Sequence, residues 1–386
     1  MPQQASLHGC EALPSYIEPL ASFYQCLLGY KPERTSLQEL TKSEWSEFSR
    51  RRGLNPNSLG AYLPRSQTAV ICERNPLALF HEYFGHGLFC EQTLAGRKLV
   101  DLERKLLEEE RQKFSGREFK LEEIRTFRQK SQTFKELDEF RQQNLARYEL
   151  FAVWTEYLLS EEFCLKQDFE RRYESFPRES KESIDSVVNF SRARGNLATF
   201  YEFGLARRTN PERVKRLLQD IYGKRLEEVK FAALYGSKKE FSDIDVFVVS
   251  DKLPEIYSGW LDVNVVSTKD FESGAELFDV EVTHPLSVGE FILGDRAYFE
   301  RFGRLLEQQP ITEEAILFNL RNSQEQRTRA LNHLPESRER RVGNSYSETY
   351  FANHLALKEG KRLFTREQLL LYPHGEKFIE LKGGIE

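Results

Sequence analysis

Two aspartates precede and enter a short apolar segment in the second half of the chain. Asp243 and Asp245 are separated by one residue, and residues 246–249 form a continuous apolar run, which is typical of a strand buried on both faces. Because strand side chains repeat every second residue, both carboxylates are expected on the same side. Two like charges placed together repel each other, so this pair is expected to need a cation.

The neighbouring segments supply the other parts of such a site. Residues 230–235 are predicted to form a strand that ends at Gly236-Ser237, and residues 260–266 are predicted to form another strand, which carries Asp262. Three carboxylates on neighbouring strands, beside a Gly-Ser turn that can hold phosphate, make a two-Mg²⁺ site for phosphoryl transfer.

This constellation resembles the polymerase β-type nucleotidyltransferase superfamily, particularly its minimal and kanamycin-nucleotidyltransferase-like members. The match consists of the Gly-Ser turn, the Ser-Asp-Ile-Asp segment at residues 242–245, and Asp262. The resemblance implies that Asp243, Asp245 and Asp262 hold two Mg²⁺ ions, and that Asp262 also helps to deprotonate the acceptor. It implies transfer of a nucleotidyl group from an NTP, with ATP expected, to a small molecule, a protein side chain or an RNA end.

The same resemblance implies that Gly236 and Ser237 hold the phosphates of the nucleotide. Only five residues separate Ser237 from Asp243, whereas the family commonly has about twice that number. The short helix that follows the turn in the family is therefore expected to be truncated here. Lys238 or Lys239 is expected to take the place of the family's basic residue.

A second group of chemically competent side chains lies in the first half of the chain. Asn75 and Pro76 are typical of a helix start, as N-cap and first helical residue. The helix that they begin carries His81, Glu82 and His86, which resemble the HExxH zinc motif. In that motif the two histidines bind zinc and the glutamate acts as general base on zinc-bound water.

The spacing in this chain is HExxxH, one residue longer than the motif. Five residues turn a regular α-helix by about 500°, which leaves the two imidazoles roughly 140° apart. A single-turn π-bulge would bring His81 and His86 back together, and Gly85 is the expected place for it. Alternatively Glu82 and His86, four residues apart, are the two ligands from this helix.

A later helical pattern at residues 148–154 contains Glu149. It resembles the third-ligand helix of gluzincin metallopeptidases, including anthrax-lethal-factor-like proteins, and the resemblance covers roughly residues 58–160. Together with a predicted strand at 68–72, it implies zinc held by His81, His86 and Glu149, with Glu82 as catalytic base. Glu156 remains the alternative third ligand.

The predicted architecture is α+β with two domains. Residues 1–205 are expected to form a zincin-like helical domain with a small sheet, and residues 206–386 a nucleotidyltransferase domain with a palm at 206–300 and helices at 301–386. Two charged helices at about 97–147 are expected as an insertion, either a solvated hairpin or an arm that binds a protein partner.

Three further segments carry specific structural expectations. Residues 1–60 are predicted to be mostly helical, and residues 312–334 and 346–370 to form amphipathic helices. Residues 281–295 are predicted to form a strand, a turn and a helix start. His284 would then lie in the turn, beside a proline, with a structural role.

Composition restricts the environment of the protein. The net charge of -5 gives no overall basic field for nucleic acid. The five cysteines are scattered without a CxxC pair, which argues against a disulfide framework and a thiolate zinc site. No signal-peptide pattern and no apolar run of membrane length are present, so a cytoplasmic protein without a membrane segment is expected.

Three functions follow as hypotheses. The first is metal-dependent nucleotidyl transfer by a chain that also carries a metallopeptidase-like domain. The second is a zinc-dependent peptidase or other hydrolase that a nucleotide-binding palm regulates. The third is a non-enzymatic interaction module in which both sites are degenerate.

Overall fold

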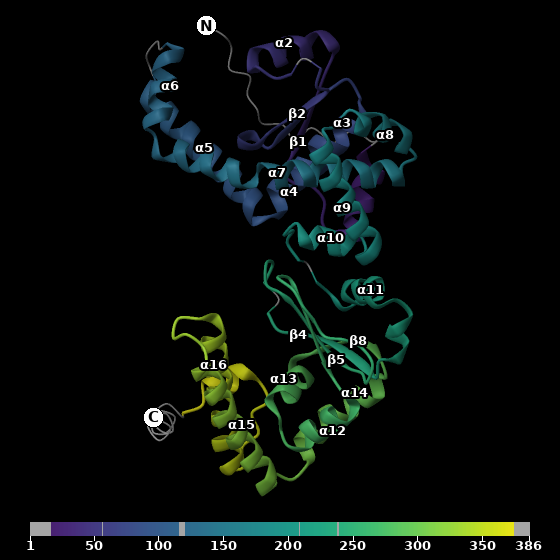
Figure 1. Cartoon of the computed structure of the whole chain (residues 1–386), viewed down its shortest axis with the longest axis vertical. Coiled ribbons are helices and arrows are strands. Elements are labelled where there is room, and N and C mark those ends of the chain that lie inside the picture. Colours follow the sequence, from purple (N-terminus) through teal and green to yellow (C-terminus); the bar gives the residue numbers. More distant parts are fainter. Residues whose placement is uncertain (1–16, 56, 116–119, 208, 238, 374–386) are drawn as a thin grey trace. The chain divides into compact units, whose positions relative to one another are not determined.

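Short strands and many helices make up both halves of the chain, as expected for the α+β class (Figure 1). The computed structural model describes residues 17–55, 57–115, 120–207, 209–237 and 239–373. The chain divides into two compact units, Met1–Arg208 and Thr209–Glu386, and each unit has its own sheet. None of the described helices combines the length and the apolar character needed to cross a bilayer.

The first unit contains a three-stranded sheet in the order β1-β3-β2. The strands are β1 (Ser36–Leu40), β2 (Gly60–Leu63) and β3 (Thr68–Cys72), with β1 parallel and β2 antiparallel to β3. The central strand β3 is apolar and almost wholly buried, which confirms the strand predicted at residues 68–72.

The prediction that residues 1–60 are mostly helical is confirmed only in part for the described residues 17–55 and 57–60. Helices α1 (Glu18–Leu28) and α2 (Lys42–Arg52) are present, but β1 lies between them and β2 begins at Gly60. Both strands are short and largely half-exposed, so neither has an apolar repeat that periodicity can detect. Their pairing with the apolar strand β3 determines their conformation. Residues 1–16, which belong to the same prediction, lie outside the described residues.

One long helical segment follows β3 and carries the histidines. Asn75 caps its first turn through a 2.8 Å hydrogen bond from the backbone N–H of Ala78, as predicted. The segment consists of α3 (Pro76–Ala78), the π-helix η3 (Leu79–Gly87) and α4 (Leu88–Gln92). Near its end, the carboxylate of Glu91 accepts hydrogen bonds from three consecutive backbone N–H groups, at Glu33, Arg34 and Thr35.

Further helices follow this segment in the first unit. They are α5 (Leu94–Phe114), α6 (Leu121–Lys130), α7 (Gln132–Glu162), α8 (Lys166–Glu174), α9 (Arg178–Arg194) and α10 (Asn196–Glu202). The predicted pair of helices at 97–147 is therefore α5, α6 and the first half of α7. Helix α7 runs without a break into the Glu149 segment, because its 31 residues contain neither glycine nor proline.

The second unit contains a five-stranded sheet in the order β6-β7-β5-β4-β8. The strands are β4 (Phe231–Tyr235), β5 (Ile244–Val249), β6 (Ile256–Tyr257), β7 (Leu261–Val266) and β8 (Glu290–Gly294). β5 and β7 are parallel and the other pairs are antiparallel. All four residues of the run 246–249 are fully buried, so the strand is covered on both faces as predicted.

Helices cover this sheet and form the C-terminal part of the unit. They are α11 (Pro211–Tyr222), α12 (Thr268–Glu276), α13 (Val280–Val288), α14 (Arg296–Gln308), α15 (Glu313–Leu331), α16 (Arg338–Lys358) and α17 (Arg366–Leu370), with a 3₁₀ turn η4 (Gly223–Glu228). A buried aromatic cluster joins β4, β5, α12 and α14 through Phe231, Phe247, Phe271 and Phe302. α15 and α16 confirm the predicted helical character of 312–334 and 346–370, although a loop separates α16 from α17.

The predicted order of elements at 281–295 is wrong. The structure has helix α13 first and strand β8 second, and His284 lies in the helix rather than in a turn. The β-branched residues of this segment favour a strand, but the Asp279 side chain caps the helix by accepting a hydrogen bond from the backbone N–H of Glu281. His284 Nδ1 accepts a 3.3 Å hydrogen bond from the backbone N–H of Arg366, which is a structural contact.

Candidate metal centres

The helix that carries His81, Glu82 and His86 has π geometry over nine residues, Leu79–Gly87. In a π-helix each hydrogen bond spans five residues, so residues five apart lie on the same face. The rings of His81 and His86 consequently lie side by side, with centroids 4.7 Å apart. This confirms the predicted irregularity near Gly85 and extends it over the whole motif.

A close contact between two helices brings the motif onto α7. A Cβ atom on Gly85 would lie 2.7 Å from the Cα of Ala152, so only glycine allows this approach. Glu149, Ala152 and Glu156 are three and four residues apart and share one face of α7. The contact at Gly85 therefore fixes how closely both glutamates approach the histidines.

Glu149 is the glutamate that faces both imidazoles. One of its oxygens, Oε2, lies 3.6 Å from His81 Nε2 and 3.7 Å from His86 Nε2. Ligand atoms of His81, Glu82 and His86 also lie within 4.8 Å of one another. Imidazole nitrogens and carboxylate oxygens are ligands that Zn²⁺ takes in proteins, so these residues fit that ion.

Glu156 contacts His81 at Nδ1, the ring nitrogen that does not face Glu149. It is fully buried, and its Oε2 atom lies 3.1 Å from His81 Nδ1. Arg172 on α8 approaches the same carboxylate, with Nη1 2.9 Å and 3.0 Å from its two oxygens. If His81 donates its Nδ1–H to Glu156, its Nε2 remains directed towards Glu149. The alternative in which Glu156 is the third ligand is therefore less favourable than Glu149.

Without a metal, the buried charges of this cluster perturb one another strongly. Burial opposes protonation of His81, but hydrogen bonds to Glu149 and Glu156 outweigh it and raise its pKa to about 10. Burial and the charge of His81 lower the pKa of His86 to about 3. Burial raises the pKa of Glu82 to about 7, against the opposing charge of His81. Without a metal, the cluster therefore favours a positive charge on His81.

Two more residues shape the surroundings of this centre. The ring of Tyr148 stacks on His86 with centroids 3.9 Å apart. A Cβ atom on Gly60 would lie 2.7 Å from Cγ of Glu82, so the glycine at the start of the edge strand β2 leaves room for that side chain.

The second centre lies in the five-stranded sheet of the second unit. Asp245 on β5 and Asp262 on β7 are direct partners in the parallel register. Tyr235 on β4 is the partner of Asp245, and Tyr257 on β6 is the partner of Asp262. Because cross-strand partners point to the same face, these four residues form a row in the order Tyr235, Asp245, Asp262, Tyr257. We call this set the tyrosine-aspartate row.

The aspartates of the second centre influence one another electrostatically. Burial, followed by the charges of Asp262 and Asp243, raises the pKa of Asp245 to about 6. Burial and the charge of Asp243 also raise the pKa of Asp262. This confirms the predicted repulsion, and such a group of oxygen ligands fits Mg²⁺. Within the described residues, however, the three aspartates do not gather within 4.8 Å as the histidine motif does.

The Gly-Ser turn lies directly against these carboxylates. Gly236 has a φ of 81°, and a Cβ atom there would lie 2.0 Å from Oδ2 of Asp245, so a glycine is required. The Ser237 hydroxyl accepts hydrogen bonds from the Ser242 hydroxyl at 3.1 Å and the backbone N–H of Lys239 at 3.4 Å. The described residues of this connection form turns rather than a helix.

The two lysines expected at the turn have different outcomes. Lys239 is exposed beside the Ser237 hydroxyl, whereas Lys238 lies outside the described residues. Lys239 is therefore the lysine that the structure describes at this turn.

Several residues of both centres carry no signal in the sequence. Arg172 is one arginine in a charged helix, and nothing in its spacing indicates contact with Glu156. Tyr257 lies on a two-residue strand that is too short for periodicity to detect. Tyr148 could have been noticed as the immediate neighbour of Glu149, although its stacking on His86 depends on the π-helix.

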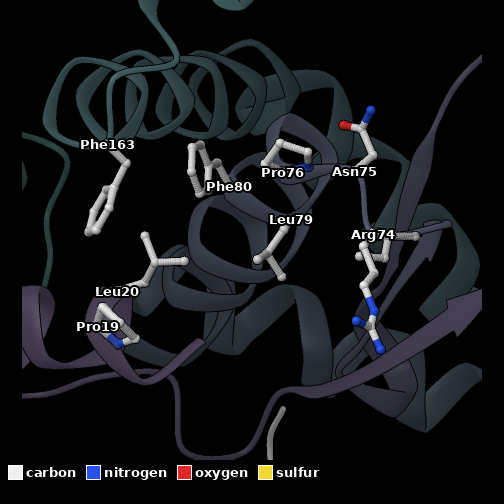
Figure 2. Close-up of a pocket in the computed structure, with 9 residues that line it drawn as sticks. Pro19, Leu20, Arg74, Asn75, Pro76, Leu79, Phe80 and Phe163 are labelled. Carbon is white, nitrogen blue, oxygen red and sulfur yellow. The ribbon is translucent and has the colours of Figure 1, made fainter. Parts of the chain in front are cut away.

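An apolar pocket of about 340 Å³ lies elsewhere in the first unit. Leu20 of α1, Phe80 of η3 and Phe163 gather around it, with Arg74 at another part of its wall (Figure 2). None of the candidate zinc ligands lines this pocket, so it is separate from the histidine centre.

No protein-family model matches this chain, and no curated protein matches it either.

Proposed function

We propose that the first unit is a zinc-dependent hydrolase of the metallopeptidase type. The observation that supports this most directly is the position of Glu149, whose Oε2 atom lies almost equally far from Nε2 of His81 and of His86. This is the arrangement expected of a third ligand in a site with two histidines and one carboxylate.

The residues around this position have separate roles in the proposed hydrolysis. His81, His86 and Glu149 would hold Zn²⁺, which when bound polarises a carbonyl and lowers the pKa of water. Glu82 takes a proton from the attacking water and delivers it to the leaving amine. Glu156 and Arg172 keep His81 in one orientation.

The test separates metal binding from hydrolysis. Glu82→Gln should retain stoichiometric zinc and lose cleavage of a mixed peptide library, whereas Glu149→Gln should lose most of the zinc. Glu139→Gln changes an exposed glutamate on the same helix and should leave both properties unchanged. Equal cleavage by wild-type protein and Glu82→Gln, or zinc-free wild-type protein, would contradict the proposal.

We propose a second function, nucleotidyl transfer, for the second unit. The supporting observation is the direct pairing of Asp245 with Asp262 on central parallel strands, with Gly236 packed against Asp245. Gly236 and Ser237 would hold the phosphates of an NTP, and Mg²⁺ when bound would polarise the α-phosphate. Asp262 would receive the proton of the acceptor hydroxyl.

Transfer is tested with each NTP labelled at the α-phosphate, Mg²⁺ and a cell lysate as a source of acceptors. Asp243→Asn and Asp245→Asn should abolish labelling, and Ser237→Ala should weaken NTP binding. Glu307→Gln, an exposed site on α14, provides the control. Label transfer that persists in both aspartate variants would contradict the assignment. Failure of both proposed activities would leave the interaction-module hypothesis.

A further inference from the structure

Tyr257 belongs to the tyrosine-aspartate row but has no role in the nucleotidyl transfer proposed for this unit. It lies on β6, the edge strand next to β7, directly opposite Asp262. Tyr257 is 66% exposed, so solvent and ligands can reach it.

The register places the Tyr257 ring next to the Asp262 carboxylate. Directly opposed residues on antiparallel strands have Cβ atoms about 5 Å apart and point to the same face. A tyrosine side chain is longer than an aspartate side chain, so its hydroxyl extends beyond the neighbouring carboxylate.

The order of the row gives the two ends different surroundings. The Gly236-Ser237 turn follows β4 directly, so nucleotide phosphates would enter at the end that Tyr235 occupies. A nucleotide bound there would bring its α-phosphate over Asp245 and Asp262. An acceptor hydroxyl must then approach from the far side of Asp262, where Tyr257 lies.

We propose that Tyr257 is itself an acceptor, and that the second unit transfers a nucleoside monophosphate to the hydroxyl of this tyrosine. This inference depends on the proposed nucleotidyl transfer. The phenolic oxygen forms a bond to the α-phosphorus of the NTP, and the bond from that phosphorus to the bridging oxygen of the β-phosphate breaks. Pyrophosphate leaves with the bonding electron pair, and Asp262 receives the phenolic proton. The product is a phosphodiester on the tyrosine.

Tyr235, at the other end of the row, provides a matched comparison. It also lies beside an aspartate of the centre, but it is only partly exposed and it interacts with the side chain of Asn264. It occupies the end next to the phosphate turn. If transfer follows the geometry of the row, Tyr257 is modified and Tyr235 is not.

The experiment uses the purified full-length chain with Mg²⁺ and each of the four α-labelled NTPs in turn. Wild-type protein should take up label, and mass spectrometry of its peptides should place the added nucleotide on Tyr257. Tyr257→Phe should lose the label, and the peptide that contains Tyr235 should stay unmodified in both proteins. Asp262→Asn should also remain unlabelled, since the proton acceptor is absent.

Parallel reactions with lysate distinguish failure of this inference from failure of the transferase assignment. If lysate components are labelled while Tyr257 is not, or if Tyr257→Phe labels itself as strongly as the wild type, Tyr257 is not the acceptor and transferase activity stands. If neither the chain nor the lysate is labelled and no pyrophosphate is released with any NTP, both proposals are overturned.

Discussion

Asp245 is a residue whose charge opposes folding when no metal is present. Its folded-state pKa of about 6 exceeds the ordinary value of 3.8, because burial and two neighbouring carboxylates disfavour ionisation. The folded protein therefore keeps a proton that the unfolded chain releases between those values. Its contribution to stability is fully present below about pH 4 and is lost as the pH rises through about 6.

Asp245→Asn should therefore stabilise the metal-free protein at pH 7, by up to about 2 kcal/mol after allowance for solvent screening. Denaturant unfolding at pH 4 and pH 7 measures the effect, which should be small at the lower pH. Added Mg²⁺ should stabilise the wild type more than the variant. A variant less stable than the wild type at pH 7 in chelator would contradict this explanation.

The two glutamates of α7 are predicted to respond differently to the same substitution. Glu149→Gln should remove most zinc affinity, since its oxygen faces both imidazoles. Glu156→Gln should reduce zinc affinity by only about 10- to 100-fold, because it acts through His81. It should also destabilise the unit by about 1–2 kcal/mol, since Arg172, whose side chain is 37% exposed, loses its charged hydrogen-bond partner.

Competition with a chromophoric chelator measures the affinities, and thermal unfolding measures the stabilities. The combination Glu156→Gln with Arg172→Met tests whether the two side chains act as a pair. Its loss of stability should be smaller than the sum of the single losses. Zinc affinities that fall equally in the two single glutamate variants would mean that Glu156 is also a direct ligand.

Residue type and spacing are sufficient to locate His81, Glu82, His86 and the three aspartates in the sequence. Those residues lie close together along the chain or on predictable strands. Arg172 and Tyr257 could not be found in this way, because one reaches its partner through the packing of α8 and the other through strand register. Both relationships exist only after the chain has folded.

At the level of elements, the close packing of the π-helix on α7 depends on the absence of a side chain at Gly85. Gly85→Ala would place a Cβ atom 2.7 Å from the α7 backbone at Ala152, so the helices must separate. We expect a loss of stability of about 1–3 kcal/mol from overpacking, together with weaker zinc binding. Metal analysis and thermal unfolding of the same preparations measure both effects.

Gly303→Ala is the matched control, because this glycine also lies in a helix but has open space around its Cβ position. Alanine is favoured over glycine in a helix by up to about 1 kcal/mol, so this variant should be neutral or stabilising. If Gly85→Ala behaves like Gly303→Ala and binds zinc normally, close packing at Gly85 does not set the metal geometry.

Elements with a strong apolar signal were predicted correctly, and those that depend on their partners were not. Strands β3, β4, β5 and β7 have apolar sequences that indicate burial by themselves. β1 and β2 contain polar residues and become strands by pairing with β3. In α13, a cap at Asp279 outweighs the strand preference of its β-branched residues, and local propensity alone does not include that contact.

At the scale of the whole molecule, each unit carries its own sheet and its own candidate centre. Zinc and a magnesium nucleotide should therefore stabilise the chain through different residues. Each ligand, at a hundredfold excess over its dissociation constant, should contribute about 2.7 kcal/mol. Calorimetry of the full-length chain measures the shift that each ligand produces.

His86→Ala should remove the zinc shift and retain the nucleotide shift, and Asp243→Asn should do the reverse. The same instrument and protein concentration serve for both variants, so each acts as the control of the other. Loss of both shifts in a correctly folded single variant would show that the two centres depend on each other.

The π-helix also preserves the orientation of the helical segment that follows the extra residue. Five residues in the π region place His86 on the face where four residues would place it in a regular α-helix. If the extra residue were present in a regular α-helix, every later side chain would turn by about 100°. Glu91 would then leave the three backbone amides of residues 33–35 that it holds. Deleting one residue between His81 and His86 should therefore restore a regular helix and keep Glu91 in its place.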